Sequence, residues 1–228
     1  MSRPAGVDRE RLALDMRVTA RQLFEHALAE AAIDRAFQRH VDCERGVMRV
    51  CEDLYQLDSY SRVLVIALGK AATGMVNSLE MQAGKRFEGI IATSVAPGPQ
   101  LPGFRYFHGG HPTPNDDSVR AGAAMLKSLF ALDSSCLVIF LISGGGSSIV
   151  EKPIDDEISL PDLIATYRAL VLSGAPIGEI NTIRKHLSAI KGGRLAKAAS
   201  GAWQVSLLVS DLERRSETRR SDTESSGR

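Results

Sequence analysis

The fold of this chain is decided by one stretch, CLVIFLISGGGSS, at residues 136–148. Its first seven residues form an unbroken apolar run, rich in branched side chains, which is typical of a strand buried on both faces of a parallel sheet. Three consecutive glycines follow after a single serine. Because each glycine adds conformational freedom that folding must remove, the triplet favours a loop that another group has to approach closely.

Strand-like and helical segments alternate on both sides of that stretch. This alternation predicts an α/β fold, with a parallel sheet and helices on both of its faces. The other expected strands are residues 62–68, 89–94, 105–109 and 203–209, and the expected helices are residues 16–32, 44–57, 71–80, 116–131, 160–172 and 177–199.

Helical spacing also predicts which side chains the helices bury. The expected inward residues are Leu23, Phe24, Ala27, Leu28 and Ala31 in the first helix, Val47, Val50, Cys51 and Leu54 in the second, and Val119, Ala123, Leu126 and Phe130 in 116–131.

Composition excludes several classes of protein. The 228 residues have a formal net charge of +1, without the basic surplus typical of nucleic-acid-binding proteins. No apolar run approaches the roughly 18 residues that span a bilayer, and the N-terminus lacks a signal peptide's apolar core. The cysteines are three in number and show no CxxC spacing, as expected in a reducing compartment. We therefore expect a cytoplasmic protein without nucleic-acid or membrane partners.

The last sixteen residues differ from the rest of the chain. From Glu213 to Arg228 there is no apolar side chain, so this segment can bury nothing to offset its ordering entropy. The sequence predicts one α/β domain over residues 1–212 and a polar, disordered tail over residues 213–228. A natural tail and a truncated or frame-shifted end both explain the abrupt change.

Two loops that follow predicted strands have the residue types of an anion site. Gly69 and Lys70 come directly after strand 62–68, where a helix start and a compact cation suit phosphate or carboxylate. The loop after strand 136–142 offers a concave array of N–H donors flanked by hydroxyls, from Ser143, Gly144, Gly145, Gly146, Ser147 and Ser148. A solvent-exposed lysine and a flexible connecting loop are the alternatives. The chain has neither a GxxxxGK[ST] phosphate loop nor a GxGxxG dinucleotide fingerprint.

The segment 179–194 divides by helical period into two faces. Ile180, Ile183, Leu187 and Ile190 form the expected buried stripe, whereas Asn181, Arg184, Lys185, Ser188 and Lys191 follow one another on a second face. That cationic stripe suits phosphate oxygens, as phosphoryl transfer requires. A solvated basic face is the alternative.

Two further positions have residue types suited to a site. His111 lies in a proline-rich turn before a predicted helix, as a candidate general acid or base or a substrate contact. With His108 it could form a metal pair, although no third ligand is nearby. Asp211 follows the last predicted strand and is a candidate metal ligand or proton acceptor.

These motifs, in this order, resemble those of the glycerate kinase family of type 2, whose members also have a C-terminal MOFRL domain. The stretches that carry the resemblance are ARQLFEHAL (20–28), GKAA (69–72), GHPTP (110–114), LISGGGSS (141–148) and EINTIRKHLSAIKGGRLA (179–196). The resemblance implies a Rossmann-like N-terminal domain and ATP-dependent phosphorylation of D-glycerate, usually at the 2-hydroxyl. It implies MgATP, or ATP with another divalent cation, as co-substrate, with the catalytic lysine at Lys70 and the glycine-rich loop at Ser143–Ser148.

The chain departs from the family pattern near its end. Where the family continues with Ser-Asp-Val-Pro-Gly-Asp, this chain has Ser210, Asp211 and Leu212 and then the polar tail. The resemblance implies that the MOFRL domain, which supplies a second cleft wall and an arginine, is absent. Three functions therefore stand as hypotheses: a glycerate kinase or its N-terminal portion, an inactive domain that acts at most as a binding module, and a hydroxypyruvate reductase. The missing dinucleotide fingerprint argues against the last. Oligomeric state, and the choice between the 2- and 3-hydroxyl, stay open.

Overall fold

The computed structural model describes residues 9–96 and 98–209. Its elements in chain order are α1 (Arg9–Glu30), α2 (Ile33–His40), β1 (Val41–Glu44), β2 (Val47–Val50), β3 (Asp53–Gln56), a 3-10 turn (Leu57–Ser59), β4 (Arg62–Leu68), α3 (Ala72–Ala83), β5 (Glu88–Thr93), β6 (Phe104–His108), α4 (Asp116–Phe130), β7 (Cys136–Ile142), α5 (Gly146–Ile149), α6 (Leu160–Leu172), α7 (Ile177–His186), α8 (Arg194–Ala198) and β8 (Trp203–Leu208).

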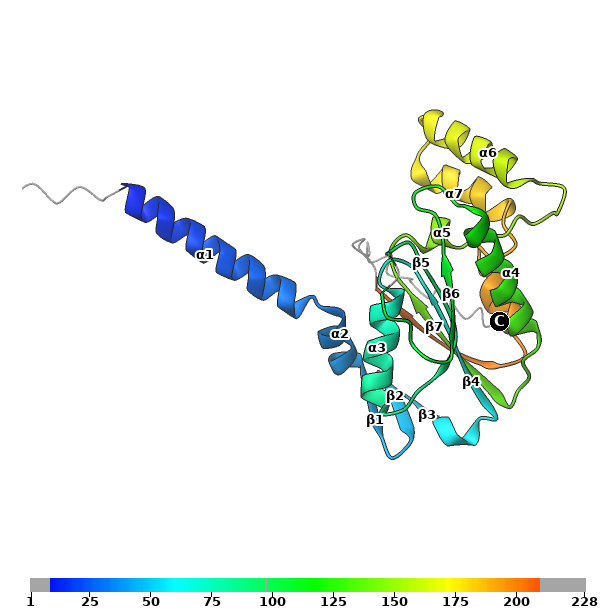
Figure 1. Cartoon of the computed structure of the whole chain (residues 1–228), viewed down its shortest axis with the longest axis horizontal. Helices are drawn as coiled ribbons and strands as arrows, with labels where there is room; N and C mark the ends of the chain where they lie inside the picture. The colour runs from blue at the N-terminus through cyan, green and yellow to red at the C-terminus, as the bar shows by residue number, and fades with distance from the viewer. Residues whose placement is uncertain (1–8, 97, 210–228) are drawn as a thin grey trace, which may run out of the picture.

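A five-stranded parallel sheet in the order β6-β5-β4-β7-β8 organises the molecule (Figure 1). Its central strands β4 and β7 run side by side from Arg62 opposite Cys136 to Leu68 opposite Ile142. Both are buried over almost their whole length, as their unbroken apolar sequences predict. The predicted α/β fold with a parallel sheet is therefore confirmed.

Helices cover both faces of this sheet, as expected. One core packs α4, α5 and α8 against side chains such as Leu64 and Val138, and the other packs α2 and α3 against their neighbours Val65 and Leu137. From β4 the chain builds outward through β5 to β6 and then crosses to β7 on the other side of β4. The direction in which successive strands are added to the sheet therefore reverses between β4 and β7. In open α/β sheets, ligands bind beyond the carboxyl ends of the two strands where this reversal occurs.

The prediction of a helix over residues 44–57 is wrong, because this segment forms an antiparallel sheet in the order β1-β2-β3. Met48 and Val50 are buried two residues apart, which is the period of a strand. A tight turn reverses the chain at Arg45 and Gly46, both with positive φ. Leu54, expected on the buried face, is 66% exposed.

The helix over 116–131 is confirmed, but its predicted buried face is only partly right: Val119 and Leu126 are half-buried, and Leu126 packs against the core. Phe130 is 72% exposed, and Ala123 is exposed too. The residues that α4 buries are Ser118, Ala121, Gly122, Met125 and Leu129. Close approach decides the orientation, since a Cβ on Gly122 would lie 2.4 Å from the carbonyl oxygen of Glu151.

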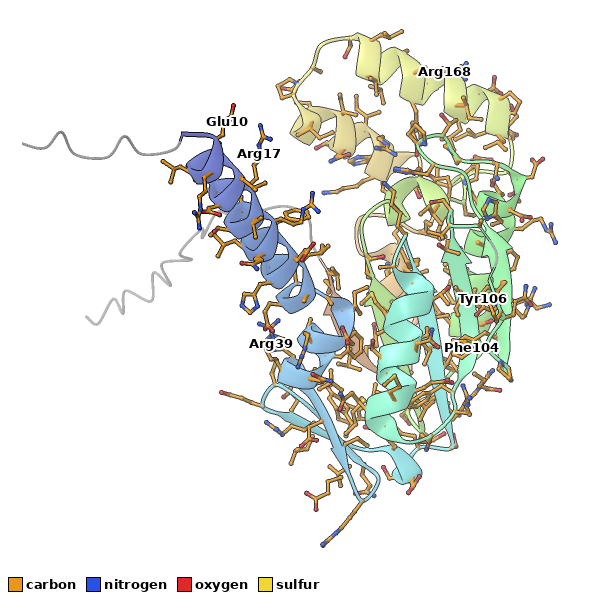
Figure 2. The ribbon with its side chains drawn as sticks, turned by 60° about the vertical axis from the view of Figure 1, so that its left-hand side comes forward. Glu10, Arg17, Arg39, Phe104, Tyr106 and Arg168 are labelled. Atoms are coloured by element: carbon orange, nitrogen blue, oxygen red, sulfur yellow. The ribbon has the colours of Figure 1, made fainter. Side chains whose placement is uncertain are left out.

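Helix α1 also differs from its predicted environment. The helix is present, yet Leu23, Phe24 and Leu28 on its expected inward face are 62–67% exposed. It projects away from the sheet in both views, and its side chains, Arg17 among them, point into open space (Figures 1 and 2). Amphipathic spacing therefore predicted the helix and not its burial.

The expectations for the end of the chain fall outside the described residues. These are the domain boundary at residue 212, the polar tail over 213–228 and the metal ligand Asp211. Within the described part, none of the helices is both long and apolar enough to cross a membrane.

Candidate active site

The loops that follow β4 and β7 are joined by hydrogen bonds at the carboxyl edge of the sheet. The Lys70 N–H donates to the carbonyl oxygen of Gly144 at 2.9 Å, and the Ala71 N–H donates to Ser143 Oγ at 3.0 Å. Gly69 has φ +117°, and a Cβ there would lie 2.3 Å from Ser143 Oγ. Only glycine fits this contact, so the two predicted loops form one structure.

The glycine triplet supplies both close packing and open N–H donors. A Cβ on Gly146 would lie 2.5 Å from Leu68 Cδ1, and Gly145 adopts a left-handed φ of +85°. In the described structure, no carbonyl oxygen accepts from the N–H groups of Gly144, Gly145 or Ser147. Of these, the N–H groups of Gly144 and Gly145 are consecutive, an arrangement that suits an anion-binding nest, whereas the Gly146 N–H donates to the Ser143 carbonyl oxygen at 3.3 Å.

Lys70 lies against this loop. Its side chain is exposed, and a Cβ on Gly145 would be 3.4 Å from Lys70 Cγ and Cε. Helix α3 begins two residues later at Ala72, so the positive end of its dipole faces the same region. Ammonium group, helix start and amide nest thus meet at one edge.

His111 reaches the same loop from a turn between β6 and α4. Its Nδ1 is 2.8 Å from Ser148 Oγ. The turn is held by a capping box, in which Asn115 accepts from the Ser118 N–H and Ser118 accepts from the Asn115 N–H. Among the described residues, no three His, Cys, Asp or Glu side chains gather to hold a metal ion, so His108 and His111 have no third ligand there.

The continuous helix expected over 177–199 is interrupted, which is a correction to the cationic stripe. Helix α7 ends at His186, and α8 begins only at Arg194. Between them the chain pairs with the segment after α5, through the Ile154 N–H to the Leu187 carbonyl at 3.0 Å and the Ala189 N–H to the Lys152 carbonyl at 2.8 Å. These strand-like bonds remove residues 187–189 from the helix, so Ser188 and Lys191 do not continue the face of Arg184. Ile183, expected to be buried, is 44% exposed.

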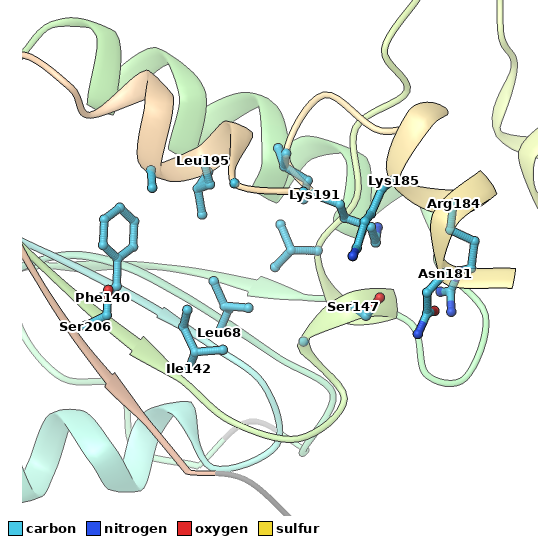
Figure 3. A pocket seen from close by; sticks show the side chains of 16 residues that line it. Leu68, Phe140, Ile142, Ser147, Asn181, Arg184, Lys185, Lys191, Leu195 and Ser206 are labelled. Atoms are coloured by element: carbon cyan, nitrogen blue, oxygen red, sulfur yellow. The ribbon is translucent and has the colours of Figure 1, made fainter. Parts of the chain in front are cut away.

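Most of the predicted cationic and polar residues nevertheless line one cavity of about 400 Å³ (Figure 3). Ser147, Asn181, Arg184, Lys185 and Lys191 lie at one end of it. Its other end is walled by apolar side chains and one serine, namely Phe140, Leu195 and Ser206. Although the helix is interrupted, the tertiary structure therefore brings together Asn181, Arg184, Lys185 and Lys191, which are most of the polar stripe that the sequence periodicity predicted. Lys70 and His111 are not among the residues that line this cavity.

The comparison with protein families shows to which family the chain belongs. The model described as "Domain of unknown function (DUF4147)", a domain that forms the N-terminal part of glycerate 2-kinase, matches residues 19–216. The chain belongs to this DUF4147 family.

Named relatives of this DUF4147 chain include kinases. It is 36% identical over 201 residues to the glycerate 2-kinase of Pyrococcus horikoshii, which covers 88% of this chain and 44% of the relative. It is 38% identical over 152 residues to a protein of Agrobacterium vitis provisionally named a hydroxypyruvate reductase, covering 66% of this chain and 34% of the relative. The crystal structure of a glycerate kinase from Thermotoga maritima superposes with a TM-score of 0.71 at 31% identity, covering 87% of this chain and 45% of that one. The chain thus spans less than half the length of these relatives.

Arg184 of this DUF4147 domain has an unsatisfied donor. Its buried Nε has no hydrogen-bond partner among the described residues. The guanidinium carbon lies 4.5 Å from the centroid of the Tyr167 ring, a cation–π contact that fixes its plane. Arg184 also lines a second cavity of about 450 Å³ between α6 and the turn at Pro112–Pro114. No protein acceptor among the described residues offsets the cost of burying this donor.

Glu151 is the residue of the site that the sequence analysis missed. It is fully buried and accepts from Ser188 Oγ at 2.6 Å, from the Tyr167 hydroxyl at 2.7 Å and from the ammonium of Lys191. Burial lowers the pKa of Lys191, against the opposing effect of Glu151, and burial together with Glu151 raises that of Tyr167. The one available signal was an acidic residue directly after the apolar pair Ile149–Val150.

Proposed function

We propose that this DUF4147 domain is the N-terminal portion of a glycerate kinase and holds the groups that bind MgATP and D-glycerate for phosphoryl transfer. The observation that carries the proposal is one cavity lined by Arg184 and Lys185, neither of which has a carboxylate partner in the described structure, and by Ser147 of the glycine loop, whose N–H no carbonyl oxygen accepts. These donors converge on one anion with several oxygens, which a triphosphate supplies. The names of the relatives support the kinase class.

The shape of the cavity suggests how the nucleotide lies in it. Phosphates at the end formed by Arg184, Lys185 and Ser147 leave the apolar end, with Phe140 and Leu195, for the base. Glycerate then binds on the other side of the glycine loop, between Lys70 and His111. The bond to Ser148 uses Nδ1 of His111, which leaves Nε2 to contact glycerate or to accept its hydroxyl proton.

In the transfer itself, the bond between the γ-phosphorus and the oxygen of ADP breaks. A bond forms between that phosphorus and the 2-oxygen of glycerate, whose hydroxyl proton leaves. Lys70, Arg184 and Lys185 neutralise the charge that spreads over the phosphoryl oxygens, and Asn181 hydrogen-bonds to them. Gly69 and Ser143 shape the loop, Lys191 lies at the cavity in an ion pair with Glu151, and Ser188 hydrogen-bonds to Glu151. Magnesium enters as part of the substrate MgATP.

The experiment is to incubate the chain with MgATP and D-glycerate and to identify the product by ³¹P NMR, which separates 2- from 3-phosphoglycerate. Calorimetric titration with ATP measures binding independently of transfer. Replacing Lys185 by alanine should weaken ATP binding, while replacing Lys197, exposed on α8 and not part of the cavity lining, should leave it unchanged. An ATP affinity indifferent to Lys185→Ala contradicts the placement of the phosphates.

A binding module is the second candidate, because the chain spans less than half the length of its relatives. It requires ATP or glycerate binding with no transfer by the chain alone. A reductase requires oxidation of NADH in the presence of hydroxypyruvate, which absorbance at 340 nm reads directly. The Agrobacterium relative's name motivates that assay, and the missing GxGxxG fingerprint predicts a negative result.

A further inference from the structure

Glu151 joins three segments that are distant in sequence. Its Oε1 accepts from the Lys152 N–H at 3.0 Å and from Ser188 Oγ, and its Oε2 accepts from the Tyr167 hydroxyl and the Lys191 ammonium. The side chain of Glu151 is 0% exposed and that of Lys191 is 12% exposed. Every oxygen of the carboxylate therefore has two donors, and all of them are withdrawn from solvent.

Stability alone does not account for such a cluster. A buried ion pair is often no better for stability than a well-packed apolar pair of the same volume, because desolvation offsets the attraction. What the cluster does provide is geometry. It holds Lys191 at the cavity directly, and it anchors the phenol whose ring stacks under the guanidinium of Arg184.

We propose that Glu151 is a positioning residue of the site, which orients Lys191 through the ion pair and Arg184 through Tyr167. Its charge also cancels that of Lys191, so Arg184 and Lys185 supply the net positive charge of the cavity. The effect on ATP binding rests on the proposed function, whereas the orientation of Arg184 does not. The two can therefore fail separately.

The first test needs no ligand. The buried Nε–H of Arg184 should give a distinct ¹H–¹⁵N signal, assigned by its loss in Arg184→Lys. Glu151→Gln should shift or broaden this signal. The matched control is Glu80→Gln, because Glu80 is also buried, accepts from a backbone N–H (Phe87) and pairs with an arginine (Arg86), but lies outside the cavity lining. An Arg184 signal that Glu151→Gln leaves in place overturns the proposal.

The second test separates positioning from mere charge compensation. Glu151→Gln leaves the Lys191 ammonium buried without its partner and should lower Tm. The double variant Glu151→Gln/Lys191→Met removes both charges and should recover much of that loss. ATP affinity should fall about 10- to 100-fold in the single variant and stay low in the double variant, because Arg184 is still misplaced.

Recovery of ATP affinity together with Tm in the double variant would mean that Glu151 only compensates the buried lysine, and it overturns the proposal. If the unmodified chain binds no ATP, the proposed function fails. In that case the Arg184 signal, compared between Glu151→Gln and Glu80→Gln, still decides whether Glu151 positions the guanidinium.

Discussion

The amino and carboxyl ends of the parallel strands differ in whether their lysines and arginines form ion pairs with carboxylates. At the amino ends of the strands, Arg62 pairs with Glu88 at 2.6 Å and Lys85 with Asp58 at 3.4 Å. At the carboxyl ends, neither Lys70 nor Arg184 nor Lys185 has a carboxylate partner within the described structure. The acids near these ends have other partners: Glu151 pairs with Lys191, and Asp117, beside the end of β6, pairs with Arg120.

Under the proposed function, the paired charges contribute to stability and the unpaired cations are the ones that bind a ligand. Exposed pairs such as Arg62–Glu88 contribute about 0–1 kcal/mol to stability. Uncompensated cations around a cavity gain most of their interaction energy only when an anion binds. Substitutions of the cations at the carboxyl ends should therefore change activity or ATP binding, whereas matched substitutions at the amino ends should change stability slightly. Four comparisons follow.

The largest effect is expected for Lys70. Lys70→Met should lower turnover by about 10²- to 10³-fold, because a charge that stabilises the transferring phosphoryl group is lost. The same change at Lys85, at the opposite end, should leave turnover unchanged and cost less than about 1 kcal/mol in stability. Steady-state kinetics and urea unfolding measure both. A Lys70→Met enzyme as active as the parent would remove the distinction between the two ends.

The second comparison uses two glycines with positive φ. Gly69→Ala should destabilise the chain by roughly 3 kcal/mol or more, because the new Cβ meets Ser143 Oγ at 2.3 Å in addition to backbone strain. Gly84→Ala, at the end of α3, has open space around its Cβ and should cost only about 1–2 kcal/mol. Urea unfolding gives both values, and equal costs would contradict the tight contact between the two loops.

Two arginines provide the third comparison. Arg184→Lys removes the planar guanidinium that stacks on Tyr167 and lines the cavity, and should weaken ATP binding about tenfold, since a hydrogen bond to a charged group contributes about 1.5–3 kcal/mol. Arg86→Lys, at the amino end, should leave ATP affinity as it is. Calorimetry tests both variants. A loss that is the same for both would point to a general effect of charge.

The smallest effect concerns pH. Burial and Glu151 raise the pKa of Tyr167 above its ordinary value of about 10, so above that pH the unfolded chain loses a proton that the folded chain retains. Stability is therefore fully present below pH 10 and falls above it, by up to about 1.4 kcal/mol per pH unit. Tyr167→Phe should flatten this slope relative to the parent. Tyr55→Phe, at a tyrosine less buried and far from Glu151, should change it less.

Several parts of the fold could be predicted because their signals are local. Strands such as 62–68 and 136–142 need no partner to be identified, since a run buried on both faces is apolar throughout. The helix over 44–57 was a wrong prediction because Val47, Val50 and Leu54 also have helical spacing. Only the pairing with β1 and β3, set by the turns, selects the period of two.

The site shows the same division. Lys70 and the loop 143–148 were predicted from their positions after strands, and the strand order brings them together. The stripe from Arg184 to Lys191 was read as one helix face, although bonds between residues 152–154 and 187–189 interrupt the helix. Glu151 gave almost no signal, because a glutamate's burial depends on partners up to 40 residues away.

By itself the sequence determined the α/β class, the strands of the parallel sheet and the loops whose residue types suit an anion, since each depends on short-range patterns of polarity and glycine. Tertiary structure alone decided which faces of α1 and α4 are buried, where α7 ends and which cation has an acid partner. These depend on contacts between segments that are distant in sequence. The free-energy cost of burying a polar or charged side chain is offset only where another segment places a partner within hydrogen-bonding distance.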